Sequence, residues 1–88
     1  MTTVRKLAWD KNGWSDYLYW QQQEKKTLKR INRLVQDTLV SPFDGIGKPE
    51  PLKENSSGYW SRRIDETNRL VYQVSDKYIT VISCRYHY

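Results

Sequence analysis

The sequence predicts an α+β fold in which a short N-terminal strand and two helices are followed by an antiparallel meander sheet. Apolar residues at helical spacing occupy the first half of the chain, and runs with strand-like alternation occupy the second. Residues 41–51, between the halves, contain all three prolines and exclude a helix or a central strand there. A chain of 88 residues is expected to form one domain, residues 1–88, with a thin core.

The first half is predicted to contain the N-terminal strand and both helices. Residues 4–9 are rich in β-formers, and residues 10–13 supply a turn and helix-capping side chains. Two groups of apolar residues at helical spacing follow: Trp14, Tyr17 and Leu18, then Leu28, Ile31, Leu34 and Val35. Lysines and arginines occupy the outer face of the second helix, for which a solvated surface and an RNA contact are equally good interpretations.

The second half is predicted to form the meander. Strand-like runs span residues 60–66, 69–75 and 78–86, and the short segments 67–68 and 76–77 join them at hairpin-like spacing. The helices are expected to cover one sheet face and to leave the other open. Side-chain alternation allows Arg69 and His87 to meet on the open face, whereas Cys84 falls on the presumed core face.

Composition narrows the classes of protein that the chain can represent. Fifteen lysines and arginines against ten acids give a net charge of +5, which favours nucleic acid or an acidic protein segment as partner. The single cysteine, Cys84, excludes an internal disulfide and a paired-thiol zinc site, as is typical of a cytoplasmic protein. No apolar run reaches the length of a membrane span, and no signal core follows the N-terminus, so no membrane association is expected.

The motif content favours RNA cleavage without a metal or cofactor. The sequence has no Gly-rich phosphate loop, no HExxH and no carboxylate cluster at metal-binding spacing. RNA supplies its own nucleophile, the 2′-hydroxyl, so a protein must remove its proton, stabilise the phosphorane and protonate the 5′-oxygen. A carboxylate or a histidine can be the base, arginine can bind the phosphate, and an imidazole can be the acid. The candidates are Glu50, Lys53, Arg62, Arg63, Arg69, Arg85, His87 and Tyr88.

Several short segments resemble one known family. They are Trp14-x-x-Tyr17-x-x-Trp20, GKPEPLK at residues 47–53, SRRI at 61–64, RLVY at 69–72 and CRYHY at 84–88. Each segment is a weak signal alone, but together, in this order and at these separations, they resemble the YoeB toxins of the RelE/ParE-like superfamily. The resemblance covers nearly the whole chain and implies a RelE-like, microbial-ribonuclease-like fold.

The resemblance implies a toxin of a type II toxin–antitoxin system that cleaves messenger RNA in the ribosomal A site. Glu50 matches the family's general base, Arg69 the arginine that stabilises the phosphate, and His87 the general acid. Lys53 and Tyr88 match further active-site positions. The implied partners are the mRNA and a YefM-like antitoxin, and the resemblance is also compatible with a homodimer. Related toxins often carry another acid just before the arginine, where this chain has Thr67-Asn68, so a contribution from that position is open.

Other interpretations stand beside this one. Glu50 could pair with Lys48 or Lys53, and His87 could be an ordinary residue near a chain end. Arg62, Arg63 and Arg85 could contact RNA, but the adjacent pair Arg62-Arg63 could equally blunt a sheet edge. A ParE-like toxin that acts without cleaving RNA and a basic RNA-binding module are alternative functions. A carboxylate among phosphate-binding groups adds repulsion, which favours the nuclease over a pure binder.

Overall fold

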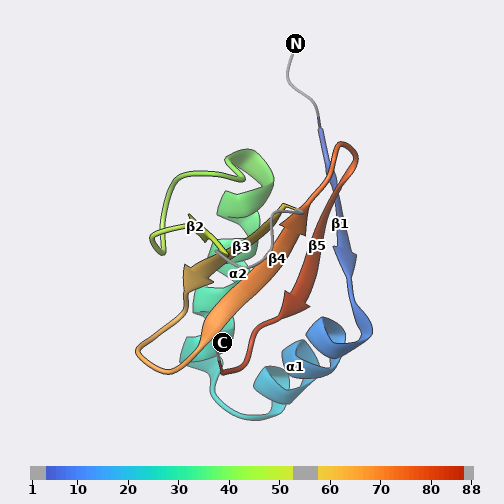
Figure 1. Cartoon of the computed structure of the whole chain (residues 1–88). Helices are drawn as coiled ribbons and strands as arrows, with labels where there is room; N and C mark the ends of the chain where they lie inside the picture. Colours follow the sequence, from blue (N-terminus) through green and yellow to red (C-terminus); the bar gives the residue numbers. More distant parts are fainter. Residues whose placement is uncertain (1–3, 53–57, 87–88) are drawn as a thin grey trace.

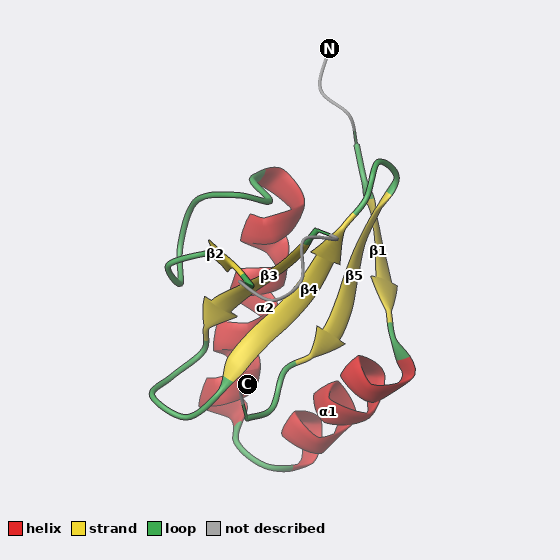
Figure 2. Ribbon diagram, in the orientation of Figure 1, coloured by secondary structure: helices red, strands yellow, loops and turns green. Residues whose placement is uncertain are grey.

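The computed structural model describes residues 4–52 and 58–86. The elements in chain order are β1 (Lys6–Trp9), α1 (Lys11–Gln22), α2 (Lys25–Val40), β2 (Glu50–Pro51), β3 (Tyr59–Arg63), β4 (Arg69–Val74) and β5 (Tyr78–Ser83). Helix α2 passes behind the sheet in the view of Figure 1, and α1 lies near the ends of β1 and β5. The predicted α+β order of strand, two helices and meander is therefore confirmed (Figure 2).

Within the described residues, one sheet contains the five strands in the order β1-β5-β4-β3-β2. Strands β3, β4 and β5 form the predicted antiparallel meander. β1 extends this sheet as an edge strand, parallel to β5, with Lys6 opposite Tyr78. The antiparallel meander is thus confirmed, and the parallel pairing of the first strand with the last makes the sheet as a whole mixed.

Helix α1 begins at Lys11, ahead of the first apolar residue of its predicted stripe. Asp10 caps the helix, with a side-chain oxygen that accepts a hydrogen bond from the Asn12 N–H at 3.2 Å. Gly13 permits close packing on the sheet, because a Cβ there would lie 2.3 Å from the Val81 carbonyl oxygen. Gly13, predicted as the last residue of the turn, therefore lies in α1 and packs against β5.

The core lies between α2 and the sheet. Its buried residues are Ile31, Leu34 and Val35 of α2 together with Ile64, Leu70, Tyr72, Ile79, Val81 and Cys84. The predicted apolar stripe of α2 and the predicted core position of Cys84 are both confirmed. Full burial of a large aliphatic side chain contributes about 1.5–3 kcal/mol, so these few residues carry much of the stability of the fold.

The last strand differs from its prediction. β5 ends at Ser83, and an irregularity in its pairing with β4 places Val71 opposite Ser83 but Tyr72 opposite Val81. Val81 and Ser83 are two residues apart and would share a face in a regular strand, whereas here they pair with residues on opposite faces. Alternation therefore cannot be extended along residues 78–86 to place the C-terminal residues.

The sheet face opposite α2 is less open than predicted. Ser61, Val71 and Ser83 belong to this face, and their exposed fractions are 1%, 3% and 1%. Solvent reaches the longer side chains around this centre, such as Glu50 and Arg63, instead of the centre itself. Among the described residues, none of the helices has the length and hydropathy needed to cross a membrane.

Candidate active site

The register of three strands brings Glu50 and Arg69 together on the face opposite α2. Glu50 in β2 pairs with Ser61 in β3, and Arg69 begins β4 opposite Arg63. Side chains at alternate positions of β3 share a face, so Ser61 and Arg63 place both candidates on the same side. The Arg69 guanidinium then donates to a Glu50 carboxylate oxygen at 3.0 Å and to the Ser61 hydroxyl at 3.4 Å.

The pair is accessible to a ligand. The side chain of Glu50 is 61% exposed and that of Arg69 is 28% exposed. An ion pair this exposed contributes only about 0–1 kcal/mol to the free energy of folding, so it does little to stabilise the protein. It joins a carboxylate that can accept a proton to a guanidinium that can bind a phosphate. Among the described residues, the ion-pair partner of Glu50 is Arg69, while the alternative partner Lys53 lies outside them.

Glu50 lies on a two-residue strand within the segment predicted to be a loop. Pro51 is tolerated because β2 is at the edge of the sheet, where one side of the strand needs no partner. Upstream, the backbone N–H of Arg63 donates to the carbonyl of Gly47 at 2.7 Å, which fastens the approaching chain to β3. Gly47 has a φ of 79°, and a Cβ there would lie 2.7 Å from a methyl of Leu34.

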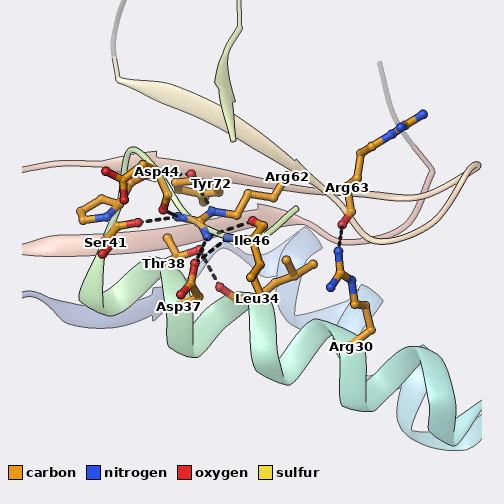
Figure 3. Close-up of polar contacts among 11 residues, drawn as sticks. Arg30, Leu34, Asp37, Thr38, Ser41, Asp44, Ile46, Arg62, Arg63 and Tyr72 are labelled. Atoms are coloured by element: carbon orange, nitrogen blue, oxygen red, sulfur yellow. Dashed lines mark hydrogen bonds and ion pairs between the residues drawn. The ribbon is translucent and has the colours of Figure 1, made fainter. Parts of the chain in front are cut away.

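Arg62 is buried, which corrects its prediction as an RNA-contacting residue. Its exposed fraction is 0%, and its side chain points toward α2, away from the face that carries Glu50 (Figure 3). The guanidinium donates to Asp37 at 2.6 Å, and it also donates to three loop carbonyls, those of Ser41, Asp44 and Ile46. Its Nε donates to the Tyr72 hydroxyl at 3.1 Å. All of its donors are directed inward, so Arg62 is a structural residue.

The bonds of Arg62 hold the loop between α2 and β2. Tyr72 adds a bond from its hydroxyl to the Pro42 carbonyl at 2.8 Å. The hydrogen bond from Arg62, followed by one from the Ile46 N–H, lowers the pKa of Asp37 below its ordinary value despite partial desolvation. Asp37 is the structural partner of Arg62, and the sequence did not reveal it because its position in α2 looks like that of any polar helix residue.

Arg63 and Arg85 remain on the surface. The side chain of Arg63 extends away from α2, while its carbonyl accepts a hydrogen bond from Arg30 at 3.2 Å (Figure 3). Arg85 is half-buried and stacks its guanidinium 3.7 Å from the centre of the Tyr19 ring and 4.8 Å from that of Tyr86. Both arginines can therefore present positive charge to a polyanion without breaking a buried bond.

The chain returns to Arg69 after β5. The backbone N–H of Arg69 donates to the Tyr86 carbonyl at 2.9 Å, and the Tyr86 N–H donates to the Asn68 side-chain oxygen at 2.7 Å. The position immediately before His87 in the sequence thus lies beside the candidate arginine. The predicted site residues Lys53, His87 and Tyr88 themselves lie outside the described residues.

Potential metal ligands do not cluster within residues 4–52 and 58–86. No group of three or more histidine, cysteine, aspartate or glutamate side chains there could hold a metal ion. The chemistry available in the described part of this site is that of one carboxylate, arginine side chains and backbone groups.

Comparison with known proteins finds relatives that match nearly the whole chain. The profile of the YoeB-like toxin of bacterial type II toxin–antitoxin systems matches residues 9–88. The toxin YoeB of Escherichia coli (strain K12) is 57% identical over 83 residues, which cover 94% of this chain and 99% of that protein. The YoeB dimer from Staphylococcus aureus is 44% identical with a TM-score of 0.88, covering 97% of this chain and 99% of that chain. The YoeB–YefM complex from the same species is 45% identical with a TM-score of 0.84, covering 96% and 98%.

Proposed function

The chain belongs to the YoeB-like toxins of bacterial type II toxin–antitoxin systems, and we propose from this that it cleaves messenger RNA in the ribosomal A site. The observation that carries the proposal is the accessible pair of Glu50 and Arg69, with 3.0 Å between carboxylate and guanidinium. The two groups come from strands that are distant in sequence and meet on an accessible part of the sheet face.

In the proposed mechanism Glu50 removes the proton of the 2′-hydroxyl, and the resulting oxyanion attacks the adjacent phosphorus. Arg69 stabilises the added negative charge of the phosphorane with paired N–H donors. His87 protonates the departing 5′-oxygen, which leaves a 2′,3′-cyclic phosphate on the upstream fragment. Each proton transfer contributes typically about 10²–10⁴-fold, and positioning of the codon by the ribosome supplies much of the remainder. No metal or cofactor takes part in this scheme.

Three features support these roles. The ion pair keeps Glu50 beside the group that binds phosphate, so a phosphate that engages Arg69 arrives next to the base. The exposed fraction of Glu50, 61%, leaves room for a ribose to approach. The backbone bond between Arg69 and Tyr86 holds the residue that precedes His87 in the sequence beside Arg69.

The remaining candidates have supporting roles. We assign Lys53 and Tyr88 to the active site on the family resemblance, and Arg63 and Arg85 to RNA contact on their surface positions. Arg62 is not included, because its guanidinium is fully enclosed. A cytoplasmic location is part of the proposal, since the substrate is messenger RNA on a translating ribosome.

The proposed partner is a YefM-like antitoxin with an acidic segment that is disordered when free. Such a segment would be attracted to a chain of net charge +5 and would fold over the basic surface, including Arg69. A YoeB dimer and a YoeB–YefM complex are known for the relatives from Staphylococcus aureus, and we propose that this chain can form both assemblies.

The deciding experiment uses ribosomes programmed with an mRNA whose A-site codon carries either a 2′-hydroxyl or a 2′-deoxy substitution at the cleaved position. We expect cleavage of the first, with a 2′,3′-cyclic or 3′-phosphate end identified by mass spectrometry. We expect none of the second, because the attacking group is missing. The Glu50→Ala variant should bind the same ribosomes nearly normally but cleave at least about 10²-fold more slowly.

Two results would redirect the proposal. Cleavage of the 2′-deoxy codon would mean that water is the nucleophile, and the assignments of base and acid would be withdrawn. Tight binding of RNA or ribosomes with no cleavage of either substrate would instead support a basic RNA-binding module.

A further inference from the structure

Asn68 connects the β3–β4 turn to the end of the described chain. The Asp65 carboxylate accepts hydrogen bonds from the backbone N–H groups of Thr67 and Asn68, at 2.8 and 2.7 Å, and from the Asn68 amide nitrogen at 3.2 Å. Because the carboxylate can only accept, it orients the Asn68 amide with the NH₂ toward Asp65. The amide oxygen is then left to accept the Tyr86 N–H at 2.7 Å. With an exposed fraction of 7%, Asn68 makes these bonds in a buried setting.

Tyr86 is held in a backbone conformation that residues other than glycine seldom adopt. Its φ is 62°, in the left-handed region. Its N–H is bound by Asn68 and its carbonyl by the Arg69 N–H. The cost of such a conformation is comparable to the net gain from one or two hydrogen bonds, so loss of a single bond is enough to release it.

Asp65 and Asn68 form a preorganised unit. Desolvation by burial raises the pKa of Asp65, but the hydrogen bonds from Asn68 and Thr67 outweigh it, and the pKa lies below its ordinary value. The carboxylate is therefore ionised at neutral pH and keeps the Asn68 amide oriented. Stacking of Arg85 against Tyr86 and Tyr19 adds a second contact to the same C-terminal segment.

We propose that Asn68 is a positioning residue for the general acid: by holding Tyr86 it sets where, relative to Arg69, the chain continues to His87. The inference rests on the proposed function and gives a role to the residue immediately before Arg69. Asn68 acts in this proposal through its hydrogen bond to the Tyr86 N–H. The Thr67 side chain has no part in this contact, since Thr67 contributes its backbone N–H.

The test compares Asn68→Ala, Asn68→Asp and the control Glu66→Gln, which alters an exposed residue of the same turn. Asn68→Ala removes the acceptor for the Tyr86 N–H. Asn68→Asp keeps an oxygen acceptor but places a second carboxylate beside Asp65, so it should lower the melting temperature at least as much. Amide hydrogen exchange at Tyr86 reports the contact directly, and we expect faster exchange in Asn68→Ala than in the wild type, Asn68→Asp or Glu66→Gln.

Single-turnover cleavage is then measured with a normal 5′-oxygen and with a 5′-thio leaving group, which needs no proton. With oxygen, Asn68→Ala should be slower by about 10- to 100-fold, and Asn68→Asp should stay within about threefold of the wild type. With sulfur, Asn68→Ala should recover to within about threefold, as His87→Ala should. Across the variants, the rate with oxygen should follow the protection of the Tyr86 amide and not the melting temperature.

The possible failures are distinct. If Asn68→Ala is equally slow with both leaving groups while His87→Ala is rescued by sulfur, Asn68 does not act through the acid and the inference is wrong. Unchanged exchange at Tyr86 in Asn68→Ala would overturn it as well. If sulfur fails to rescue His87→Ala itself, the acid role in the proposed function is wrong, whatever Asn68 does to Tyr86.

Discussion

At Cys84 the thiol is enclosed between α1 and the end of β5. Its Sγ lies 3.9 Å from the Gly13 carbonyl oxygen, and its backbone N–H donates to Asp16 at 3.0 Å. Burial, reinforced by the negative charge of Asp16, raises the pKa of the thiol from 9.0 to about 12. A thiol with so high a pKa is a poor nucleophile at neutral pH, so its contribution is packing.

This pKa shift predicts a loss of stability in alkali that depends on Cys84. Below pH 9 the thiol is protonated in both the folded and the unfolded chain, and its full contribution is present. Between pH 9 and about 12 the unfolded chain ionises first, so the free energy of unfolding should fall by up to about 1.4 kcal/mol per pH unit from this group. Urea unfolding of the wild type and Cys84→Ser at several pH values should show the steeper fall in the wild type.

Cys84→Ser also tests the packing role at neutral pH. It should lower the free energy of unfolding by about 1–3 kcal/mol, because a hydroxyl replaces a thiol in a buried site. Cleavage at a temperature where the variant is folded should stay within about tenfold of the wild type, well short of the loss expected for an acid or base. A hundredfold loss of cleavage with unchanged thermal stability would contradict the packing role. If the free energies of unfolding of the wild type and Cys84→Ser fell equally with pH, the pKa shift would be contradicted.

At the scale of elements, alternation along β3 places its two adjacent arginines on opposite sides of the sheet. Arg62 faces α2 and gathers the carbonyls of the preceding loop, whereas Arg63 faces the side that carries Glu50 and Arg69. The loop continues directly into β2, so the bonds of Arg62 and the bond between Arg63 and Gly47 together determine where Glu50 enters the sheet. Of these two adjacent arginines, Arg62 is therefore enclosed and structural, whereas Arg63 stays exposed.

The matched pair Arg62→Met and Arg63→Met follows from this arrangement. Arg62→Met should lower the free energy of unfolding by on the order of 3 kcal/mol, because Asp37 and buried carbonyls lose their donor. Arg63→Met should change it by less than about 0.5 kcal/mol, as is typical of exposed sites, while it weakens cleavage of ribosome-bound mRNA. Chemical denaturation and single-turnover cleavage measure the two effects. Equal stability losses would show that the enclosed guanidinium is not the source of the difference.

At the scale of the whole molecule, the net charge of +5 produces a field that acts beyond any single contact. Lys25, Lys26 and Lys29 contribute to it from exposed positions on α2. Helix α2 lies against the opposite side of the sheet from the Glu50–Arg69 pair, so these lysines are remote from the proposed chemistry. Substitution of these lysines should therefore change the electrostatic attraction of the substrate without changing the catalytic groups.

Replacing these three lysines together by glutamine should lower kcat/KM for ribosome-bound mRNA at low salt. The difference from the wild type should disappear at high salt, because exposed charges are then screened. The single-turnover rate at saturating toxin should be unchanged at both salt concentrations. A salt-independent loss would favour a direct RNA contact by α2, which is the alternative that its basic outer face leaves open.

Local patterns in the sequence determined the elements. The helical spacing of Ile31, Leu34 and Val35 predicts the buried face of α2, and the prolines of residues 41–51 predict an irregular segment before the sheet. Alternation and turn positions predict the hairpins, because these signals depend on neighbours in the chain. The family resemblance singled out Glu50 and Arg69, which the structure brings into contact, while their catalytic roles stay a prediction.

Only the tertiary structure decided which distant segments meet. The parallel pairing of β1 with β5, the burial of Arg62 against Asp37 and the bond between Asn68 and Tyr86 each join segments well apart in the chain. The sequence does not show whether a polar residue faces water or a buried partner. The spacing of residues indicates only which side of its own helix or strand each residue occupies. The partner that satisfies it comes from another element, and the free energy of that contact exists only in the assembled fold.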